Sequence, residues 1–347
     1  MTKEHPVRRP ESPHSVTLKD IAREAGVHVS TVSRVLRQKE PARGWTPTAV
    51  QVREIARRLG YRPNSLAAGL RTSRSHSIGL LMPRLTDTVI ATICESIEAA
   101  ARYAGYQTLL TSPPDTMNAQ MESLDFLLSR QVSGIIATSL HRDDALFISK
   151  LRSLPIPFIT ANRHVGDSIP AVVSDDFEGG RKATEYLIHL GHRRIGIVAG
   201  PRHASTGYDR LLGYRRALEE SGLEIDDSLV IHSEWEVEGG VLGAHTLLAL
   251  ADPPTAIFAV NDTAAVGVMG AAHQRGLSIP GDLSLIGYND IPIVAQLPIP
   301  LTTVRSDLGQ MGSTAVHTLI RAIEGGALTS VKLPVSLIMR SSTAPPR

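Results

Sequence analysis

Hydrogen-bonding side chains gather on one face of a short segment near the N-terminus. Residues 29–37 read VSTVSRVLR, in which Val32, Val35 and Leu36 recur at the spacing of a buried helix face. The serines and arginines then lie on the outer face. Hydroxyl and guanidinium groups presented in this way can hydrogen-bond base edges and phosphates in the major groove of DNA. The pattern predicts a helix that reads DNA.

Two further helices would position this segment. Thr17 can cap a first helix that has Asp20 in its first turn and ends at Gly26, where the turn needs a positive φ. A third helix begins at Thr46 and ends at Gly60. The predicted inner residues are Ile21, Ala22 and Ala25 in the first helix and Val50, Ile55 and Leu59 in the third. A helix, a tight turn and a second helix form the helix-turn-helix arrangement, which fits a helix into the major groove.

Charge divides the 347-residue chain into a basic end and an acidic remainder. Residues 1–76 carry 15 Lys and Arg against 6 Asp and Glu, a net charge of +9, whereas the remaining residues carry 21 against 28, a net charge of −7. A solvated basic face would explain a run of charge alone. Here the positive charge coincides with the predicted helix-turn-helix, so we expect a polyanion bound at one end only.

From Ser77 onward, short apolar runs alternate with helical stretches, and this rhythm starts twice. Such runs, joined by crossover helices, give parallel sheets that are buried on both faces. The fold class is therefore a small all-α helix-turn-helix head and an α/β body with two doubly wound parallel-sheet lobes. The first series has apolar runs at 77–83, 108–112, 134–139, 158–162 and 171–176, and the second at 194–200, 229–233, 256–262 and 283–288.

Signals for other classes of protein are missing from the sequence. The motifs G-x-S-x-G, G-x-x-x-x-G-K-[ST] and H-E-x-x-H do not occur, and the 13 histidines are scattered. The single cysteine, Cys94, excludes an intrachain disulfide and falls in an apolar helix pattern as a small core residue. There is neither an N-terminal apolar run nor an 18-residue apolar stretch. We expect a cytoplasmic protein with no membrane span, no cofactor, no bound metal and no enzymatic activity.

A short segment, Arg62–His76, separates the head from the body. Asn64 can cap a helix there, but a helix of this length with Gly69 inside it is not stable alone in water. Ala67 offers little bulk, so another backbone could approach closely. Leu70 has no obvious local core and, taken alone, would be an ordinary packing residue. Residues 1–14 lack a packing pattern, which predicts a disordered tail.

These segments resemble the lactose/galactose-repressor family of bacterial transcription regulators. The resemblance covers the chain beyond residue 15 in the family's order and implies a body similar to periplasmic sugar-binding proteins. It also implies that residues 301–305 cross between the lobes and that a helix at 307–323 returns to the first lobe. The similar segments are VTLKDIAREAGVHVSTVSRVL (16–36), GYRPNSLAAGLR (60–71), FEGGRKATEYLIHLGHRRIGIVAGP (177–201), DRLLGY (209–214), DLSLIGYND (282–290) and PLTTVR (300–305).

In the head, the resemblance implies that Val29, Ser30 and Arg34 face base edges, with Arg34 able to fork onto guanine O6 and N7. A solvent-exposed helix residue is the alternative for each position. The full set of predicted DNA-binding residues is Thr17, Val29, Ser30, Thr31, Ser33, Arg34, Arg37, Asn64, Ala67 and Leu70. His28 replaces the family's small N-cap residue, and the following loop, QKEPARGW, is longer than usual. The resemblance therefore does not extend to the operator sequence.

The resemblance also gives Arg62–His76 a role as a hinge. Two hinge helices from a dimer would fold on the minor groove of DNA, and paired Leu70 side chains would pry apart the central base step. Unstacking costs about a few kcal/mol, which recovered contacts must offset.

In the body, the resemblance implies an effector pocket in the cleft between the lobes. Arg210 would grip ligand oxygens, Trp235 would cover the ligand, and Asn261 and Asn289 would each offer a donor and an acceptor. A lone Trp is more often a core residue, and an Asn after a strand is more often a cap. The predicted effector-binding residues are Val89, Ile90, Ser139, Thr206, Arg210, Trp235, Asn261 and Asn289. This set favours a sugar, a sugar acid or a nucleoside over a cationic ligand.

The sequence therefore predicts a transcription regulator, most often a repressor in this family, whose affinity for an operator is controlled by a small molecule. Its partners would be a near-palindromic double-stranded operator, the effector and a second copy of the chain, in a homodimer or a tetramer. The expected parts are a tail (1–14), a DNA-binding domain (15–62), a hinge (63–76) and an effector-binding and dimerisation domain (77–343). The alternative is a periplasmic-type binding protein without DNA function.

Overall fold

The computed structural model describes residues 16–38, 45–61, 75–167 and 169–347. Contacts divide the chain into two compact units, Met1–Ser73 and Arg74–Arg347. We call the described part of the first unit the head and the second unit the body. The expected tail (1–14) and nearly all of the expected hinge (63–76) lie outside the described residues, so both stay predictions.

The head consists of the helices α1 (Leu18–Ala25), α2 (Val29–Arg37) and α3 (Pro47–Arg58). Gly26 ends α1 with a φ of 64°, the left-handed conformation that the predicted turn requires. Small apolar side chains let the three helices approach closely around one core. Its buried members are Ile21, Ala22, Ala25, Val32, Val35, Ala49, Val52, Ile55 and Ala56.

The inner face of α3 differs from the predicted stripe. Val50 is 49% exposed, whereas Ile55 is buried and Leu59 packs against the head core. With 3.6 residues per turn, five positions rotate a side chain by about 140° from its starting direction. Val50 and Ile55 therefore cannot share a narrow face. The prediction for Val50 is wrong, and Ala49 and Val52 take the inner positions.

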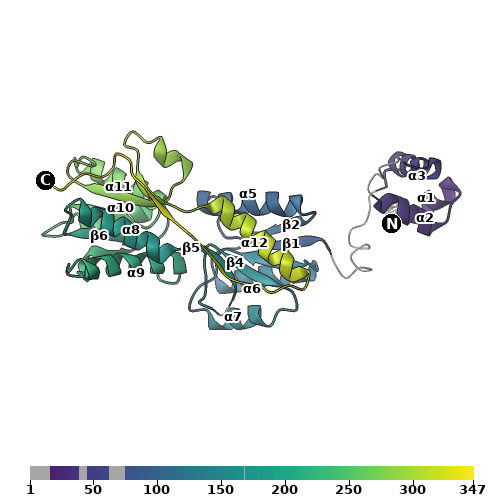
Figure 1. Ribbon diagram of the computed structural model, residues 1–347, viewed down its shortest axis with the longest axis horizontal. Helices are drawn as coiled ribbons and strands as arrows, with labels where there is room; N and C mark the ends of the chain where they lie inside the picture. The colour runs from purple at the N-terminus through teal and green to yellow at the C-terminus, as the bar shows by residue number, and fades with distance from the viewer. Residues whose placement is uncertain (1–15, 39–44, 62–74, 168) are drawn as a thin grey trace, which may run out of the picture. The chain divides into compact units, whose positions relative to one another are not determined.

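The body contains two α/β lobes with the same strand order (Figure 1). The first lobe has a six-stranded parallel sheet, ordered β11-β5-β4-β3-β1-β2. Helices α5 and α12 pack on one face of this sheet, and α6 and α7 pack on the other. The elements are β1 (Ser77–Leu81), α5 (Thr88–Tyr103), β2 (Gln107–Thr111), α6 (Met117–Ser129), β3 (Gly134–Ala137), α7 (Ala145–Arg152), β4 (Phe158–Ala161), β5 (Ala171–Ser174), α12 (Leu308–Ile323) and β11 (Val331–Leu333).

The second lobe has a six-stranded sheet ordered β12-β10-β9-β8-β6-β7, which is parallel except for the edge strand β12. Helices α8 and α9 pack on one face, and α10 and α11 pack on the other. The elements are α8 (Asp176–His189), β6 (Ile195–Ala199), α9 (Ser205–Glu220), η1 (Asp227–Leu229), β7 (Val230–His232), α10 (Val237–Leu247), β8 (Ala256–Ala259), α11 (Asp262–Gln274), β9 (Ser284–Asn289), η2 (Pro292–Ala295), β10 (Thr302–Arg305) and β12 (Ser336–Ile338).

The chain passes between the lobes three times: from β5 to α8, from β10 to α12 and from β11 to β12. The last passage is the long yellow segment that joins the two sheets in Figure 1. Residues 302–305 form strand β10 of the second sheet, so the crossing follows this segment instead of lying within it. Helix α12 then returns to the first lobe, as the resemblance implied.

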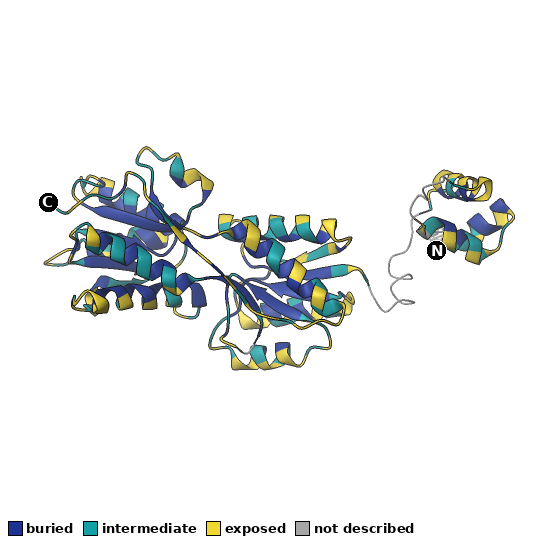
Figure 2. Ribbon diagram, in the orientation of Figure 1, coloured by how far each residue is buried: buried dark blue, intermediate teal, exposed yellow. Residues whose placement is uncertain are grey.

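Both sheets are buried between their helices, as Figure 2 shows, and all residues of β3, β4 and β8 are buried. These short apolar strands need cover on both faces, which accounts for helices on each side. Cys94 is half-buried on α5 and packs against the first lobe's core. Within the described residues, no helix combines the length and apolar character needed to cross a membrane.

Candidate functional site

The N-terminus of α2 is capped by a histidine. His28 Nδ1 accepts a hydrogen bond from the backbone N–H of Ser30 at 3.3 Å and lies 2.7 Å from Ser30 Oγ. Because Nδ1 must be unprotonated to accept the backbone N–H, the Ser30 hydroxyl donates to the same nitrogen and keeps its lone pairs for another donor. The imidazole thus performs the role of the small N-cap residue that the sequence lacks.

The predicted DNA-binding residues of α2 differ in their exposure. Ser30 and Arg34 are exposed one helical turn apart, which places them on one face of the helix. Thr31 and Ser33 are half-buried, and Val29 packs partly against the head core. The side chain of Arg37 and all of Asn64, Ala67 and Leu70 lie outside the described residues.

Thr17 stabilises the start of α1. Its hydroxyl donates to Asp20 Oδ2 at 2.7 Å, and its backbone N–H donates to the same oxygen at 2.9 Å. These bonds lower the pKa of Asp20, and the nearby Arg23 adds to the effect. Thr17 is exposed, but its hydroxyl proton is used within the helix cap.

Arg53 on α3 holds the other end of α2, a role that the sequence analysis missed. Its Nη2 donates to the carbonyl oxygens of Val35 at 3.2 Å and Gln38 at 2.7 Å. Its guanidinium lies over the Trp45 ring, 3.7 Å from the ring centroid. The last carbonyls of a helix lack partners within the helix, so an arginine there both satisfies them and fixes the direction of α2 against α3.

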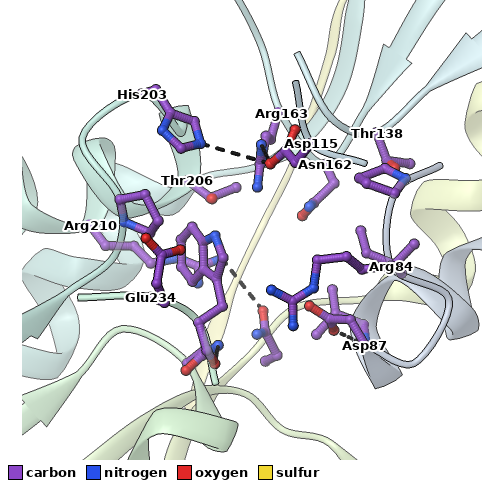
Figure 3. Close-up of a pocket in the computed structure, with 17 residues that line it drawn as sticks. Arg84, Asp87, Asp115, Thr138, Asn162, Arg163, His203, Thr206, Arg210 and Glu234 are labelled. Atoms are coloured by element: carbon purple, nitrogen blue, oxygen red, sulfur yellow. Dashed lines mark hydrogen bonds and ion pairs between the residues drawn. The ribbon is translucent and has the colours of Figure 1, made fainter. Parts of the chain in front are cut away.

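A cavity lies between the two lobes of the body, and most of the predicted effector residues line it (Figure 3). The space between its walls, open mouth included, is about 750 Å³. The predicted residues on its wall are Val89, Ile90, Thr206, Arg210, Trp235, Asn261 and Asn289. They come from α5, α9 and the carboxyl ends of β7, β8 and β9, where doubly wound sheets bind ligands.

Ser139 is the exception among the predicted effector residues. It is fully buried and does not line the cavity, whereas its neighbour Thr138 does. Both residues follow β3, and the prediction missed the lining residue by one position. The cavity lining therefore does not support the prediction for Ser139, and it includes Thr138 instead.

Arg210 is buried and already bonded on several sides. Its Nε donates to Asp176 Oδ1 at 2.8 Å, its Nη1 donates to the Val260 carbonyl, and its guanidinium lies 3.6 Å from the centroid of the Tyr288 ring. Burial raises the pKa of Asp176, and the charge of Arg210 opposes that rise. Nη2 lies 3.5 Å from Asn289 Oδ1, a weak contact that leaves this end of the guanidinium able to meet a ligand.

Trp235 is held in place by Asn261. Asn261 Nδ2 donates to the Trp235 carbonyl at 2.9 Å, and Asn261 Oδ1 caps α11 by accepting the N–H of Ala264 at 2.8 Å. Asn261 is thus chiefly a cap and a support for the tryptophan. Trp235 Nε1 is buried and has no hydrogen-bond partner among the described residues. A ring with an unpaired donor in a cavity wall suits a ligand with a flat apolar face and an acceptor at its edge.

Asn289 has a φ of 101°, a backbone conformation that residues other than glycine rarely adopt. It ends β9 at the cavity wall and is buried. Strained backbone of this kind persists where the surroundings fix it, and it clusters at binding sites.

Polar residues at the other side of the cavity were missed by the sequence analysis. Asp115, Asn162 and Arg163 follow β2 and β4, and His203 precedes α9 of the second lobe. Burial alone would raise the pKa of Asp115, but the hydrogen bond with His141, the nearby His203 imidazole and the charge of Arg163 hold it well below its ordinary value. Their positions after parallel strands were the available signal, because strand ends of this kind line clefts.

Side chains from the two lobes also meet outside the cavity wall. His164 Nε2 lies 2.7 Å from Asp209 Oδ2, and the guanidinium of Arg142 lies 3.4 Å from the centroid of the Tyr208 ring. Arg84, which does line the cavity, and Glu236 form a third pair across the lobes. The lobes are therefore in contact through polar groups that separation would expose to water.

Comparisons with known proteins match both units of the chain. Residues 17–64 match the family described as bacterial regulatory proteins, lacI family, and residues 184–343 match the periplasmic binding protein-like domain. The HTH-type transcriptional repressor PurR of Escherichia coli O1:K1 is 30% identical over 332 residues, which are 94% of this chain and 97% of that protein.

Solved structures agree over nearly the whole length. The lac repressor dimer bound to operator and the anti-inducer ONPF superposes with a TM-score of 0.87 at 28% identity, covering 95% of this chain and 99% of that one. A complex of the transcriptional regulator CelR with cellobiose has a TM-score of 0.72 at 30% identity, covering 94% of this chain and 99% of that one.

Proposed function

The chain belongs to the LacI family of bacterial regulatory proteins, and on that premise we propose that it represses transcription under the control of a small molecule bound between its two lobes. It is a DNA-binding transcription regulator with an effector-binding body. The observation that carries the proposal is the convergence of seven predicted effector residues on one cavity in a chain that also has a helix-turn-helix head.

DNA would be read by the exposed face of α2. Arg34 is suited to guanine O6 and N7, and the Ser30 hydroxyl, which donates to His28, would accept from a base amino group. Two heads of a homodimer, or of a tetramer, would bind two half-sites of a near-palindromic operator, because protein and operator symmetry correspond. Leu70, outside the described residues, would act as the wedge in the minor groove.

The effector would occupy the cavity next to Arg210, Trp235 and Asn289. A sugar, a sugar acid or a nucleoside fits the polar wall and the flat tryptophan ring. The effector must bind the DNA-competent and DNA-incompetent states with different affinity, since otherwise it would shift neither. A ligand that contacts both lobes supplies such a difference, because it can make all of its contacts only at one distance between the lobes.

A periplasmic-type receptor without DNA function is the weaker alternative. The match of residues 17–64 to the LacI family favours a regulator that acts in the cytoplasm, where the operator is. The relatives are named as transcription regulators, and we propose that this chain likewise has no catalytic activity.

A gel-shift experiment with the full-length protein and the DNA upstream of its own gene tests the proposal. We expect a sequence-selective shift that weakens steeply as salt rises, because phosphate contacts release counterions. Sugars, sugar acids and nucleosides are then added to find the one that changes the shift. A protein that binds such a ligand but shifts no DNA would be the receptor of the alternative.

The hinge is tested separately with Leu70→Ala. Operator affinity should fall, while the affinity for the effector stays the same. Equal operator binding by this variant would remove the wedge from the proposal and leave the rest intact.

A further inference from the structure

One end of the cavity joins the two lobes through side chains outside the predicted effector set. Thr138 and Arg163 follow strands β3 and β4 of the first lobe, and His203 precedes α9 of the second (Figure 3). We call these three residues the donor end. In Figure 3 Arg163 lies beside the carboxylate of Asp115, a dashed line joins that carboxylate to His203, and Thr138 lies on the side away from His203.

Each residue of the donor end has a buried polar atom without a hydrogen-bond partner in the described part of the chain. These atoms are Thr138 Oγ1, Arg163 Nη1 and His203 Nε2, and each can donate. Arg163 is only 7% exposed and Thr138 only 1%. Leaving a buried donor unsatisfied is costly, so three such atoms on residues that line one cavity indicate a missing acceptor.

Asp115 does not supply that acceptor. Its Oδ1 accepts from His141 Nε2 and from Gln120 Nε2, both at 2.9 Å. Its Oδ2 lies 3.6 Å from Arg163 Nη1 and 3.8 Å from His203 Nε2, beyond a good hydrogen bond. One carboxylate thus faces one guanidinium and two imidazoles, and it leaves Arg163 Nη1 and His203 Nε2 without a hydrogen-bond partner among the described residues.

A cation suits the donor end poorly. Asp115, His141 and His203 offer three possible metal-ligand atoms within 4.8 Å of one another. However, the Arg163 guanidinium lies 3.6 Å from the same carboxylate, and its charge would repel a divalent ion at that distance. Of the other cavity carboxylates, Asp87 caps α5 through the N–H of Val89 at 2.9 Å and Glu234 is exposed, and the charge of Arg84 on the same wall opposes theirs.

We propose that the effector carries an anionic oxygen group, a carboxylate or a phosphate, that binds at the donor end between Arg163 of the first lobe and His203 of the second. A guanidinium and an imidazole donate short, charge-assisted hydrogen bonds to such a group, and the Thr138 hydroxyl adds a third. The rest of the ligand would lie against Trp235, which makes it a sugar acid or a sugar phosphate. This inference rests on the proposed function, since it assumes that the cavity holds the effector.

The anion would also tie ligand binding to the spacing of the lobes. Arg163 and His203 belong to different lobes, so both can reach one anion only when the lobes are close. A neutral ligand held by the second lobe alone would not produce this difference.

The test is isothermal titration of the full-length protein at constant ionic strength with five probes. Acetate and inorganic phosphate probe the anionic group alone. Glucuronate and glucose 6-phosphate probe it attached to a sugar ring, and glucose probes the ring without it. We expect saturable binding of at least one anion and at least tenfold weaker binding of glucose. Tighter binding in the acetate and glucuronate arms identifies a carboxylate, and tighter binding in the phosphate arms identifies a phosphate.

Arg163→Gln and His203→Gln should each weaken binding of that anion at least tenfold, whereas Arg202→Gln, at an exposed neighbour, should not. Thermal unfolding verifies that each variant is folded, and His203→Gln still carries the test if loss of Arg163 unfolds the protein. The proposal fails if no anion binds saturably, if glucose binds as tightly as the anions, or if a folded His203→Gln variant keeps full affinity. Operator binding is measured in parallel, so a protein that shifts DNA and responds to a neutral ligand would overturn only this inference.

Discussion

The head and the cavity present their polar side chains in opposite ways. On α2, Ser30 and Arg34 are exposed, whereas Arg210 and Asn261 in the cavity are buried and already bonded to the protein. Exposed side chains lose conformational freedom when they bind, whereas buried ones have lost it on folding. Substitutions in the head should therefore change binding and spare stability, and substitutions in the cavity should change both.

The strongest test of this contrast is Arg210→Ala. The variant leaves the Asp176 carboxylate buried without its guanidinium, which should lower the free energy of unfolding by about 3–5 kcal/mol. Urea denaturation followed by circular dichroism measures this loss. The response to the effector should disappear, while operator binding persists under conditions in which the variant is folded.

Arg216→Ala on the same helix is the matched control. Arg216 is 53% exposed and pairs with Glu220 at the surface, so its removal should cost at most about 1 kcal/mol. Similar losses for the two variants would contradict the difference between buried and exposed positions.

A second test uses the pH dependence of stability. Burial raises the pKa of Asp262 to about 7, despite hydrogen bonds from Thr303 and the Ile291 N–H, and the charge of Asp290 adds to the rise. Because the folded pKa lies above the unfolded one, the folded state binds the proton more tightly. This carboxyl alone should lower the free energy of unfolding by about 1.4 kcal/mol per pH unit between about pH 5 and 7.

Asp262→Asn removes that titration. The difference in unfolding free energy between wild type and variant, measured by urea denaturation at several pH values, should change in favour of the variant as pH rises. A difference that stays constant from pH 5 to 7 would mean that Asp262 ionises normally in the folded protein.

In the head, Arg34→Ala should reduce discrimination between operator and unrelated DNA by about 1–3 kcal/mol. The exposed guanidinium supports no core contact, so stability and effector affinity should not change. Fluorescence anisotropy with both DNAs measures the effect. Arg57→Ala, at an exposed position of α3, is the control for loss of one positive charge. An equal loss of affinity for both DNAs would indicate that Arg34 contacts phosphates instead of bases.

The smallest effect is expected for His28→Ala, which should destabilise the head by about 1 kcal/mol through loss of the α2 cap. His28→Asn should retain most of that stability. In a Trp235→Phe background, Trp45 is the remaining tryptophan and reports unfolding of the head by fluorescence. Identical curves for the alanine and asparagine variants would exclude a capping role.

Periodic elements were predictable from the sequence. The strands are short apolar runs, and Gly26 ends α1 before α2 begins. The local sequence pattern was therefore sufficient to predict the head and two doubly wound lobes. Two of the errors arose where a shift of one residue along the chain changes the direction in which a side chain points. Val50 lies on the wrong side of a helix, and Ser139 lies one position from the residue that lines the cavity.

The donor end could not be predicted in this way. Thr138, Arg163 and His203 come from separate loops of two lobes, and no spacing along the chain connects them. The resemblance supplied Arg210 and Trp235 because their surrounding segments match the family. Contacts that depend on how two lobes meet become visible only in three dimensions.

The order of the elements along the chain has a consequence for biosynthesis. Helix α12 and strand β11, which belong to the first lobe, lie after every helix of the second lobe. Nascent chains fold from the N-terminus as they leave the ribosome, so the DNA-reading helices form early. The first lobe cannot be completed until residues 308–333 have been synthesised. A polypeptide released early, by a nonsense codon before α12, would hold complete DNA-reading helices and an unfinished sensor.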